Sequence, residues 1–334
     1  MRVLIRNLRS DEHGVASTVG TMMALLVFLT FLSLIVNQYV PVWMQDAEAA
    51  HANGALGQFG TMKGAIDLQV LSALAAKSDY VPVTASTPVT LGTEGVPIFA
   101  TPTAGSLFID PDAGSFTVAF DYSILTPSGA ELRVPVREQS NGSITLDIPN
   151  RFSAPQRIVY ENGAVIRYQN DGQVIRAQPT FLVARTDNTI RLGFQLVSLY
   201  GSGRVSGTNT EVVNSRMYAI DPQTYNRFPG DAVIRIDHTS AYGRAWYTFF
   251  NSTLAATLDL GGTFSSTPLD MSYTARAGGL VIYKVSVSYI PTRSEYVTRL
   301  EIRNNPGVLA LGSFHLEHAQ VQIGIGDSPE NALR

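Results

Sequence analysis

Hydrophobic and polar residues follow three different patterns along this chain of 334 residues. From His13 to Trp43 there is no Asp, Glu, Lys or Arg, and Val15 to Val36 is almost continuously apolar. At about 1.5 Å per residue, this run forms a helix of roughly 33 Å, enough to cross the hydrocarbon core of a membrane. The pattern therefore predicts a membrane-spanning helix near the N-terminus.

The end of the apolar run has the composition of a membrane interface. Asn37, Tyr39 and Trp43 form an amphipathic border there. A cleaved secretory signal has a shorter apolar region of about 7–15 residues, so that interpretation is disfavoured. Pro41 cannot bond to the carbonyl of Asn37, which predicts a kink in the helix close to the membrane surface.

The next segment has the periodicity of an amphipathic helix. Its apolar stripe has spacings of three and four residues and consists of Phe59, Met62, Ile66 and Val70. Another face carries Gly54, Gly57, Gly60 and Gly64. Each interior glycine costs about 1 kcal/mol relative to alanine, so we expect these four to permit close approach of a neighbouring helix. The alternative is that they break the helix near residue 54.

After Lys77, helical periodicity gives way to short β-rich runs separated by Gly, Pro and Thr. Asn162-Gly163 and Asp171-Gly172 each lie between such runs and predict type I′ hairpin turns in a three-stranded meander. A loop is expected from Asp221, and one helix is expected to end near Leu258. The predicted fold class is mainly β with a long N-terminal α-helix. Residues 78–334 would form an antiparallel β-sandwich-like ectodomain, with two subdomains dividing near residue 147 as an option.

Composition narrows the functional classes. Hydrophobic residues make up 45% of the chain and charged residues 15%, so it can fill a core. The net charge of −3, without a basic patch, argues against a nucleic-acid partner. The absence of cysteine excludes disulfides, thiolate metal sites and a cysteine nucleophile.

Charges on either side of the apolar run predict its orientation. Arg2, Arg6 and Arg9 precede the run, whereas Asp46 and Glu48 are the first charged residues after it. Positively charged flanks stay in the cytoplasm. The β-rich part is therefore expected outside the cell, anchored in the cell membrane.

Motifs for catalysis or metal binding are weak. His315 and His318 are three residues apart, which in a strand places them on opposite faces rather than around one metal. Asp110 to Gly114 has two oxygen ligands at calcium-loop spacing but not the distal acidic residues, so a plain turn is expected. No nucleophile elbow, phosphate loop or dinucleotide fingerprint occurs. We therefore expect no enzyme activity, cofactor or metal.

The N-terminus resembles a known family. The short leader "MRVLIRNLRSDEHG" abuts the apolar run, and "VASTVG", from Val15 to Gly20, is similar to the start of archaeal type IV pilin-like surface proteins with class III signal peptides. The resemblance implies that a prepilin peptidase removes residues 1–14 by cutting between Gly14 and Val15. An uncleaved signal anchor is the alternative. The segment from Ile148 to Gly207 is also similar to ectodomains of archaeal pilin-like proteins.

Residues 15–77 would then be a pilin-type helix, first a membrane anchor and later a filament core. Without charges, the apolar helix would self-associate through small residues, which allow close backbone contact. The candidate packing residues are Gly20, Ala24, Gly54, Gly57, Gly60 and Gly64. After assembly the protein would be located on the cell surface, in a pilus.

Two sequons are candidate glycosylation sites. Asn141 lies in a polar turn, whereas Asn251 follows an aromatic run and is expected to be partly buried.

The leading interpretation is a structural pilin or minor pilin, with the membrane, the prepilin peptidase and other copies of the chain as partners. A membrane-anchored adhesion or ligand-binding module that never polymerises is the second interpretation. The large size of residues 78–334 favours a minor pilin or this second interpretation. A membrane-anchored enzyme acting on glycans is the third.

Overall fold

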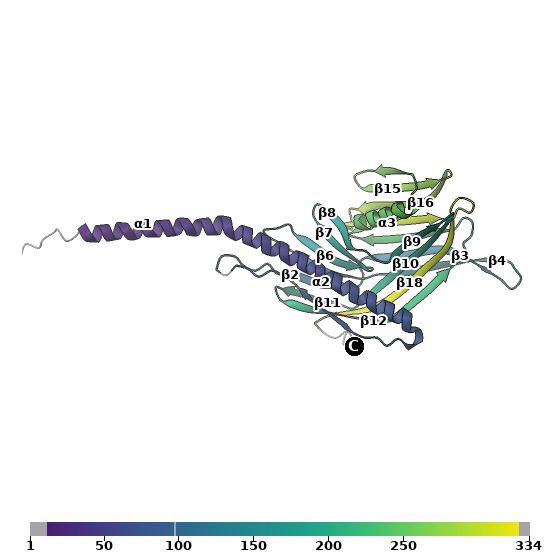
Figure 1. Ribbon diagram of the computed structural model, residues 1–334, viewed down its shortest axis with the longest axis horizontal. Coiled ribbons are helices and arrows are strands. Elements are labelled where there is room, and N and C mark those ends of the chain that lie inside the picture. Colours follow the sequence, from purple (N-terminus) through teal and green to yellow (C-terminus); the bar gives the residue numbers. More distant parts are fainter. Residues whose placement is uncertain (1–11, 97, 327–334) are drawn as a thin grey trace, which may run out of the picture.

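The N-terminal part of the chain is one long helical rod. The computed structural model describes residues 12–96 and 98–326. The rod consists of α1 (Glu12–Leu34), a π-helical turn η2 (Ile35–Tyr39), α2 (Val40–Ala76) and a 3₁₀ turn η3 (Lys77–Asp79). Figure 1 shows α1 projecting away from the β-rich part, while α2 lies across it.

The rod changes direction between α1 and α2, at the predicted kink (Figure 1). The Val40 amide donates to the carbonyl of Ile35, five residues earlier, which widens this turn into a π-helix. Pro41 follows in the first turn of α2, where its missing N–H is tolerated. The kink therefore combines a π-helical turn with the start of a new α-helix.

The rest of the described chain forms three sheets and one further helix, α3 (Gly243–Leu258). The five-stranded sheet has the order β1 (Ala85–Thr90), β12 (Thr210–Tyr225), β18 (Ala310–Ile325), β10 (Thr189–Tyr200) and β9 (Phe181–Thr186). The six-stranded sheet has the order β11 (Gly203–Gly207), β2 (Gly105–Asp110), β5 (Ser143–Ile148), β6 (Gln156–Glu161), β7 (Ala164–Gln169) and β8 (Gly172–Ala177). The seven-stranded sheet has the order β14 (Gly262–Ser266), β15 (Asp270–Ala277), β16 (Leu280–Ile290), β17 (Glu295–Arg303), β13 (Val233–Ser240), β3 (Ser115–Leu125) and β4 (Glu131–Ser140).

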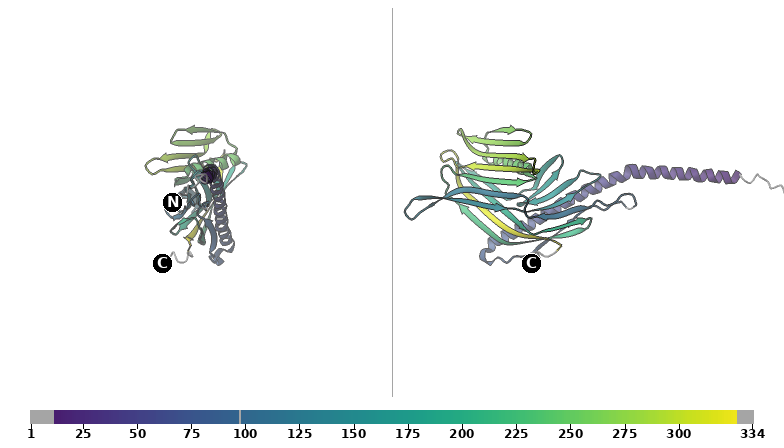
Figure 2. Two further views of the ribbon diagram at one scale, coloured as in Figure 1. Left: turned by 90° about the vertical axis from the view of Figure 1, so that its left-hand side faces the viewer. Right: turned by 180° about the vertical axis from the view of Figure 1, so that it is seen from behind.

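The predicted fold class is confirmed: a mainly β, sandwich-like domain carries a long N-terminal helix (Figure 2). The described pairings are antiparallel except that of β10 with β18, which is parallel. β10 contributes to hydrophobic clusters on both of its faces, the environment in which parallel strands are normally found. The helix predicted to end near Leu258 is α3.

Two expectations about boundaries differ from the structure. The strands before residue 147 are shared among all three sheets, so the pairing gives no division of the domain there. The loop expected from Asp221 begins only after Tyr225, because residues up to Tyr225 continue to pair with the long strand β18.

Two hydrophobic cores lie on opposite sides of the five-stranded sheet. One, the α3 core, joins this sheet to the seven-stranded sheet and includes Trp246 of α3. The other, the α2 core, joins it to the six-stranded sheet and includes Phe59 of α2. In β10, Phe194 belongs to the α3 core and Val197 to the α2 core. The central sheet therefore links the rod to the rest of the domain.

The hairpin turn predicted at Asn162-Gly163 is confirmed. Both residues have positive φ, 44° and 77°, as a type I′ turn requires. The buried Asn162 side chain also fixes the turn to β10, because its Oδ1 accepts from the Val197 amide at 2.8 Å and its Nδ2 donates to the Gln195 carbonyl at 3.2 Å.

The next hairpin differs by one residue from the prediction. Asn170 and Asp171 form the turn, and Gly172 is the first residue of β8, paired with Gln169. None of these turn residues is among those with positive φ, so the type I′ assignment was wrong here. The prediction of a two-residue turn is correct, but the turn consists of Asn170 and Asp171 instead of Asp171 and Gly172.

We expect Gly163→Val to destabilise the fold by about 1 kcal/mol or more, because valine resists positive φ. Gly172→Val is the matched control, since Gly172 has no positive φ and a Cβ there would meet no atom within 4 Å. Urea unfolding of both variants measures the difference. Equal midpoints for the two variants would contradict the assignment of strain to Gly163.

Candidate functional site

The outer half of the rod exposes apolar side chains along its whole circumference. Met22, Leu26, Phe28 and Phe31 are between 61% and 66% exposed. Within the described residues, this is the one helix long and apolar enough to cross a membrane, and its most apolar window is not buried at all. Tyr39 and Trp43 share an edge of the rod beyond this window, with ring centroids 6.0 Å apart. This half has the length and composition of a membrane anchor.

Polar side chains in the outer half bond to its own backbone. Thr30 donates to the Leu26 carbonyl at 2.8 Å, and Asn37 donates to the Ser33 carbonyl at 2.8 Å. Such bonds lower the cost of placing hydroxyl and amide groups in an apolar medium. The few polar residues are therefore compatible with lipid contact.

The inner half of the rod, α2, packs on the β domain through one stripe. Phe59, Met62 and Ile66 are completely buried in the α2 core. Burying side chains of this size contributes about 1.5–3 kcal/mol each. The stripe predicted from the spacing of apolar residues is therefore the docking face of α2.

Glu48 is a buried carboxylate within this docking face. Its Oε1 accepts from the Arg151 amide and the Thr103 hydroxyl at 3.0 Å, and its Oε2 accepts from the Phe152 and Ser153 amides at 2.9 and 2.8 Å. Burial alone would raise the pKa of Glu48, but these donors together hold the pKa below its ordinary value of 4.5. The carboxylate thus ties α2 to the loop between β5 and β6.

Two glutamine amides make the same kind of link to strands. Gln58 Oε1 accepts from the Thr90 amide at 2.9 Å, so it bonds to the end of β1. Gln69 donates to the Ser215 carbonyl at 3.0 Å and accepts from the Met217 amide at 2.8 Å, so it spans β12. Both amides supply strand backbone groups with partners that a neighbouring strand would otherwise provide.

The sequence interpretation missed these three polar residues, although a signal for two of them was present. Buried positions on α2 recur at intervals of four and three residues, and the series consists of Glu48, Ala52, Ala55, Phe59, Met62, Ile66, Gln69 and Ala73. A carboxylate and an amide that occupy positions in an apolar stripe indicate specific buried partners. Gln58 lies beside the stripe and had no such signal.

The candidate packing residues point away from the β domain. Gly54, Gly57 and Gly64 are exposed and Gly60 is half-buried, and a Cβ at any of the four would meet no atom within 4 Å. α2 runs through all four without interruption, so the alternative that they break the helix is wrong. Gly20 and Ala24 are likewise exposed on α1. No described part of the chain explains the small residues on this outer face.

The candidate processing residues lie at the start of the rod. Gly14 and Val15 belong to α1, which begins at Glu12. Residues 1–11 of the predicted leader lie outside the described residues, so the leader itself stays a prediction.

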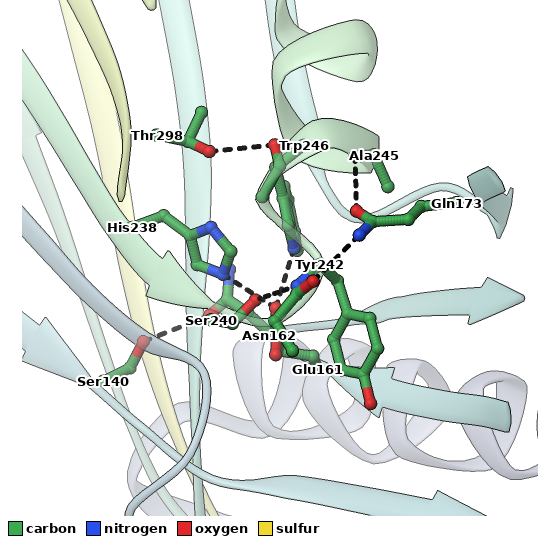
Figure 3. Close-up of polar contacts among 12 residues, drawn as sticks. Ser140, Glu161, Asn162, Gln173, His238, Ser240, Tyr242, Ala245, Trp246 and Thr298 are labelled. Carbon is green, nitrogen blue, oxygen red and sulfur yellow. Dashed lines mark hydrogen bonds and ion pairs between the residues drawn. The ribbon is translucent and has the colours of Figure 1, made fainter. Parts of the chain in front are cut away.

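A buried polar cluster connects three elements of the α3 core (Figure 3). Glu161 at the end of β6 accepts from the indole N–H of Trp246 at 2.8 Å, and the same oxygen lies 2.7 Å from Nε2 of His238 on β13. Glu161 and His238 are 1% and 0% exposed. Neither side chain reaches solvent, so the cluster joins elements of the α3 core to one another.

The remaining histidine and aspartate motifs have separate partners. His315 bonds to Thr224 at 2.8 Å, whereas His318 bonds to Ser198 at 2.8 Å. Within the described residues, no group of three metal-ligating side chains occurs. In the predicted plain turn after β2, the Asp112 amide donates to Asp110. These side chains therefore bond to a neighbouring strand or within their own turn.

The two sequon asparagines differ in accessibility. Asn141 lies between β4 and β5 and is half-buried. Asn251 lies in α3, and its buried Oδ1 has no hydrogen-bond partner among the described residues. The position of Asn141, in a connection between strands, is the more suitable for a glycan.

Comparison with known proteins gives one family similarity. Residues 151–287, from the loop held by Glu48 to β16, match a family of unknown function, DUF7289. No curated protein matches the chain. The similarity covers the middle of the β domain and does not extend to the rod.

Proposed function

We propose that this chain is a pilin-like structural subunit of an archaeal type IV pilus-like surface filament. Its apolar helix anchors it in the cell membrane, and its β domain lies outside the cell. One observation carries the proposal: a continuous rod exposes its apolar outer half and, along its docked half, turns glycines away from its own β domain. A membrane anchor that does not polymerise requires the exposed apolar half but not the outward-facing glycines.

The rod would serve both in the membrane and in a filament. In the membrane, lipid surrounds the exposed side chains of α1. In a filament, the α1 helices of other copies replace the lipid. Because this exchange brings little hydrophobic gain, association depends on close packing, which small residues permit. The glycines of α2 extend the packing surface past the membrane boundary.

A non-polymerising adhesion module is the second candidate. The size of the β domain favours it, since a simple filament subunit needs a smaller one. The two candidates differ in where the mature chain is found. Material sheared from the cell surface should contain the chain together with filaments if it is a pilin. A chain that remains wholly in the membrane fraction would favour the adhesion module.

Processing provides a separate prediction. We expect the mature protein to begin at Val15, because the leader ends in a small residue immediately before the apolar run. Gly14→Trp should block cleavage, while Gly14→Ala, which keeps the residue small, should not. N-terminal sequencing by mass spectrometry measures this. A mature fraction that retains residues 1–14, or normal processing of Gly14→Trp, would contradict the proposed cleavage.

A further inference from the structure

A polar, aromatic cavity lies at the start of α3, far along the chain from the rod. Its volume is about 320 Å³. The end of the β7–β8 hairpin, the residues before α3 and the turn between β16 and β17 surround it. Cavities from about 300 Å³ upward are large enough for small ligands.

Four tyrosine rings contribute to its lining. Tyr289 and Tyr296 lie with ring centroids 4.8 Å apart, and Tyr168 and Tyr242 meet edge to face at 5.9 Å. The Arg244 guanidinium lies over the Tyr296 ring, 5.5 Å from its centroid. Such rings offer flat apolar faces at low conformational cost and carry hydroxyls at their edges.

The base of the cavity is held in place by hydrogen bonds. The Gln173 amide on β8 donates to the Ala241 carbonyl at 2.9 Å and accepts from the Ala245 amide at 3.4 Å (Figure 3). Tyr242 is only 8% exposed, and burial raises its pKa to about 12, so it remains a neutral hydroxyl. The hairpin and α3 are therefore fixed relative to one another before any ligand binds.

Several polar groups at the cavity are free to bond to a ligand. Among the described residues, the Asn170 amide, the Asp171 carboxylate and the Arg244 guanidinium have no hydrogen-bond or ion-pair partner. Arg157 is paired with Asp147 at 3.1 Å. Among the described residues that line the cavity, one unpaired positive charge and one unpaired negative charge remain, so this lining has no excess charge to attract an anion.

We infer that this cavity binds a neutral sugar, the terminal residue or disaccharide of a glycan. Its tyrosine faces stack on the apolar C–H faces of the ring, while amide, carboxylate and guanidinium groups exchange hydrogen bonds with hydroxyls. A nucleotide would bring phosphate, which Arg244 alone would have to neutralise. The inference does not require filament assembly, because every lining residue belongs to one β domain.

The test uses the full chain in a detergent without a sugar headgroup. Saturation-transfer NMR and titration are performed with glucose, galactose, mannose, N-acetylglucosamine, maltose and lactose, and with glucuronic acid as a charged comparison. We expect at least one neutral sugar to bind, and Tyr289→Ala to weaken its binding at least tenfold. The Arg244 side chain is exposed, so we expect Arg244→Gln to leave the fold intact and also to weaken binding.

Tyr218→Ala is the matched control. Tyr218 is an exposed tyrosine on β12, and its ring lies beside that of Tyr200 on β10, outside the cavity. It should leave sugar binding unchanged. The inference is overturned if no sugar of the panel binds, if glucuronic acid binds more tightly than every neutral sugar, or if neither cavity variant weakens binding. None of these outcomes bears on whether the chain polymerises.

Discussion

Glu48→Ala is expected to loosen α2 from the β domain and to lower the free energy of unfolding by about 3 kcal/mol or more. The carboxylate accepts from three backbone amides and one hydroxyl. Each donor left without a partner in a buried site costs about 1–3 kcal/mol. Urea unfolding of the full chain in detergent measures the loss, and proteolysis of the loop containing Arg151 should become faster.

Asp46→Ala is the control for the loss of a negative charge on the same helix. Asp46 is exposed and has no ion-pair partner among the described residues, so its replacement should change stability by less than about 0.5 kcal/mol. Equal effects of the two substitutions would mean that Glu48 does not hold the loop.

The same carboxylate predicts a dependence on pH. The folded-state pKa of Glu48 lies below its ordinary value of 4.5, so its contribution is complete above that value. It is lost as the pH falls further, through the lowered pKa, because the protonated acid no longer accepts from all its donors. In Glu48→Gln this part of the acid destabilisation should be absent. Unfolding midpoints between about pH 7 and pH 3 provide the comparison.

The double variant Gly57→Leu, Gly60→Leu is expected to abolish filaments while leaving the anchored monomer folded. Leucine side chains at these positions meet no atom of the chain at Cβ, so the docking of α2 is undisturbed. Leucine also favours helix over glycine, by up to about 1 kcal/mol per site. Monomer stability should therefore stay equal or rise, whereas helices of adjacent copies can no longer approach closely. Electron microscopy of cells and thermal unfolding of the purified chain measure the two effects.

Gly261→Leu is a suitable control for a leucine added to an exposed glycine. Gly261 lies on the β domain, away from the rod, and a Cβ there also meets no atom within 4 Å. This variant should form normal filaments. Normal filaments in the double variant would remove the packing argument, and a misfolded double variant would show that the outer face of α2 is not free.

The rod could be predicted from the sequence because its two signals are local. An apolar run of membrane length and a stripe at helical spacing depend on neighbours within a few turns. The same stripe contained Glu48 and Gln69, but the backbone groups to which they bond are between 103 and 148 residues away in the chain. No local pattern indicates which distant backbone amides a buried carboxylate will meet.

In the β domain, too, local features could be predicted from the sequence and contacts between distant strands could not. At Asn162-Gly163 the turn chemistry and the register agree, since the glycine has the positive φ that the turn requires. At the next hairpin the turn formed one residue earlier, with Gly172 drawn into β8. The parallel pairing of β10 with β18 joins strands more than 100 residues apart and has no local signal. The tyrosine cavity likewise combines three distant segments.

High-resolution electron microscopy of filaments purified from cells that produce the wild-type chain tests the central claim most directly. Mass spectrometry of the same material identifies the subunit. We predict a filament core of packed helices from this chain, with Gly54, Gly57, Gly60 and Gly64 against a helix of an adjacent copy. A wild-type chain found solely as membrane-bound monomers, with no filament containing it, would contradict the account.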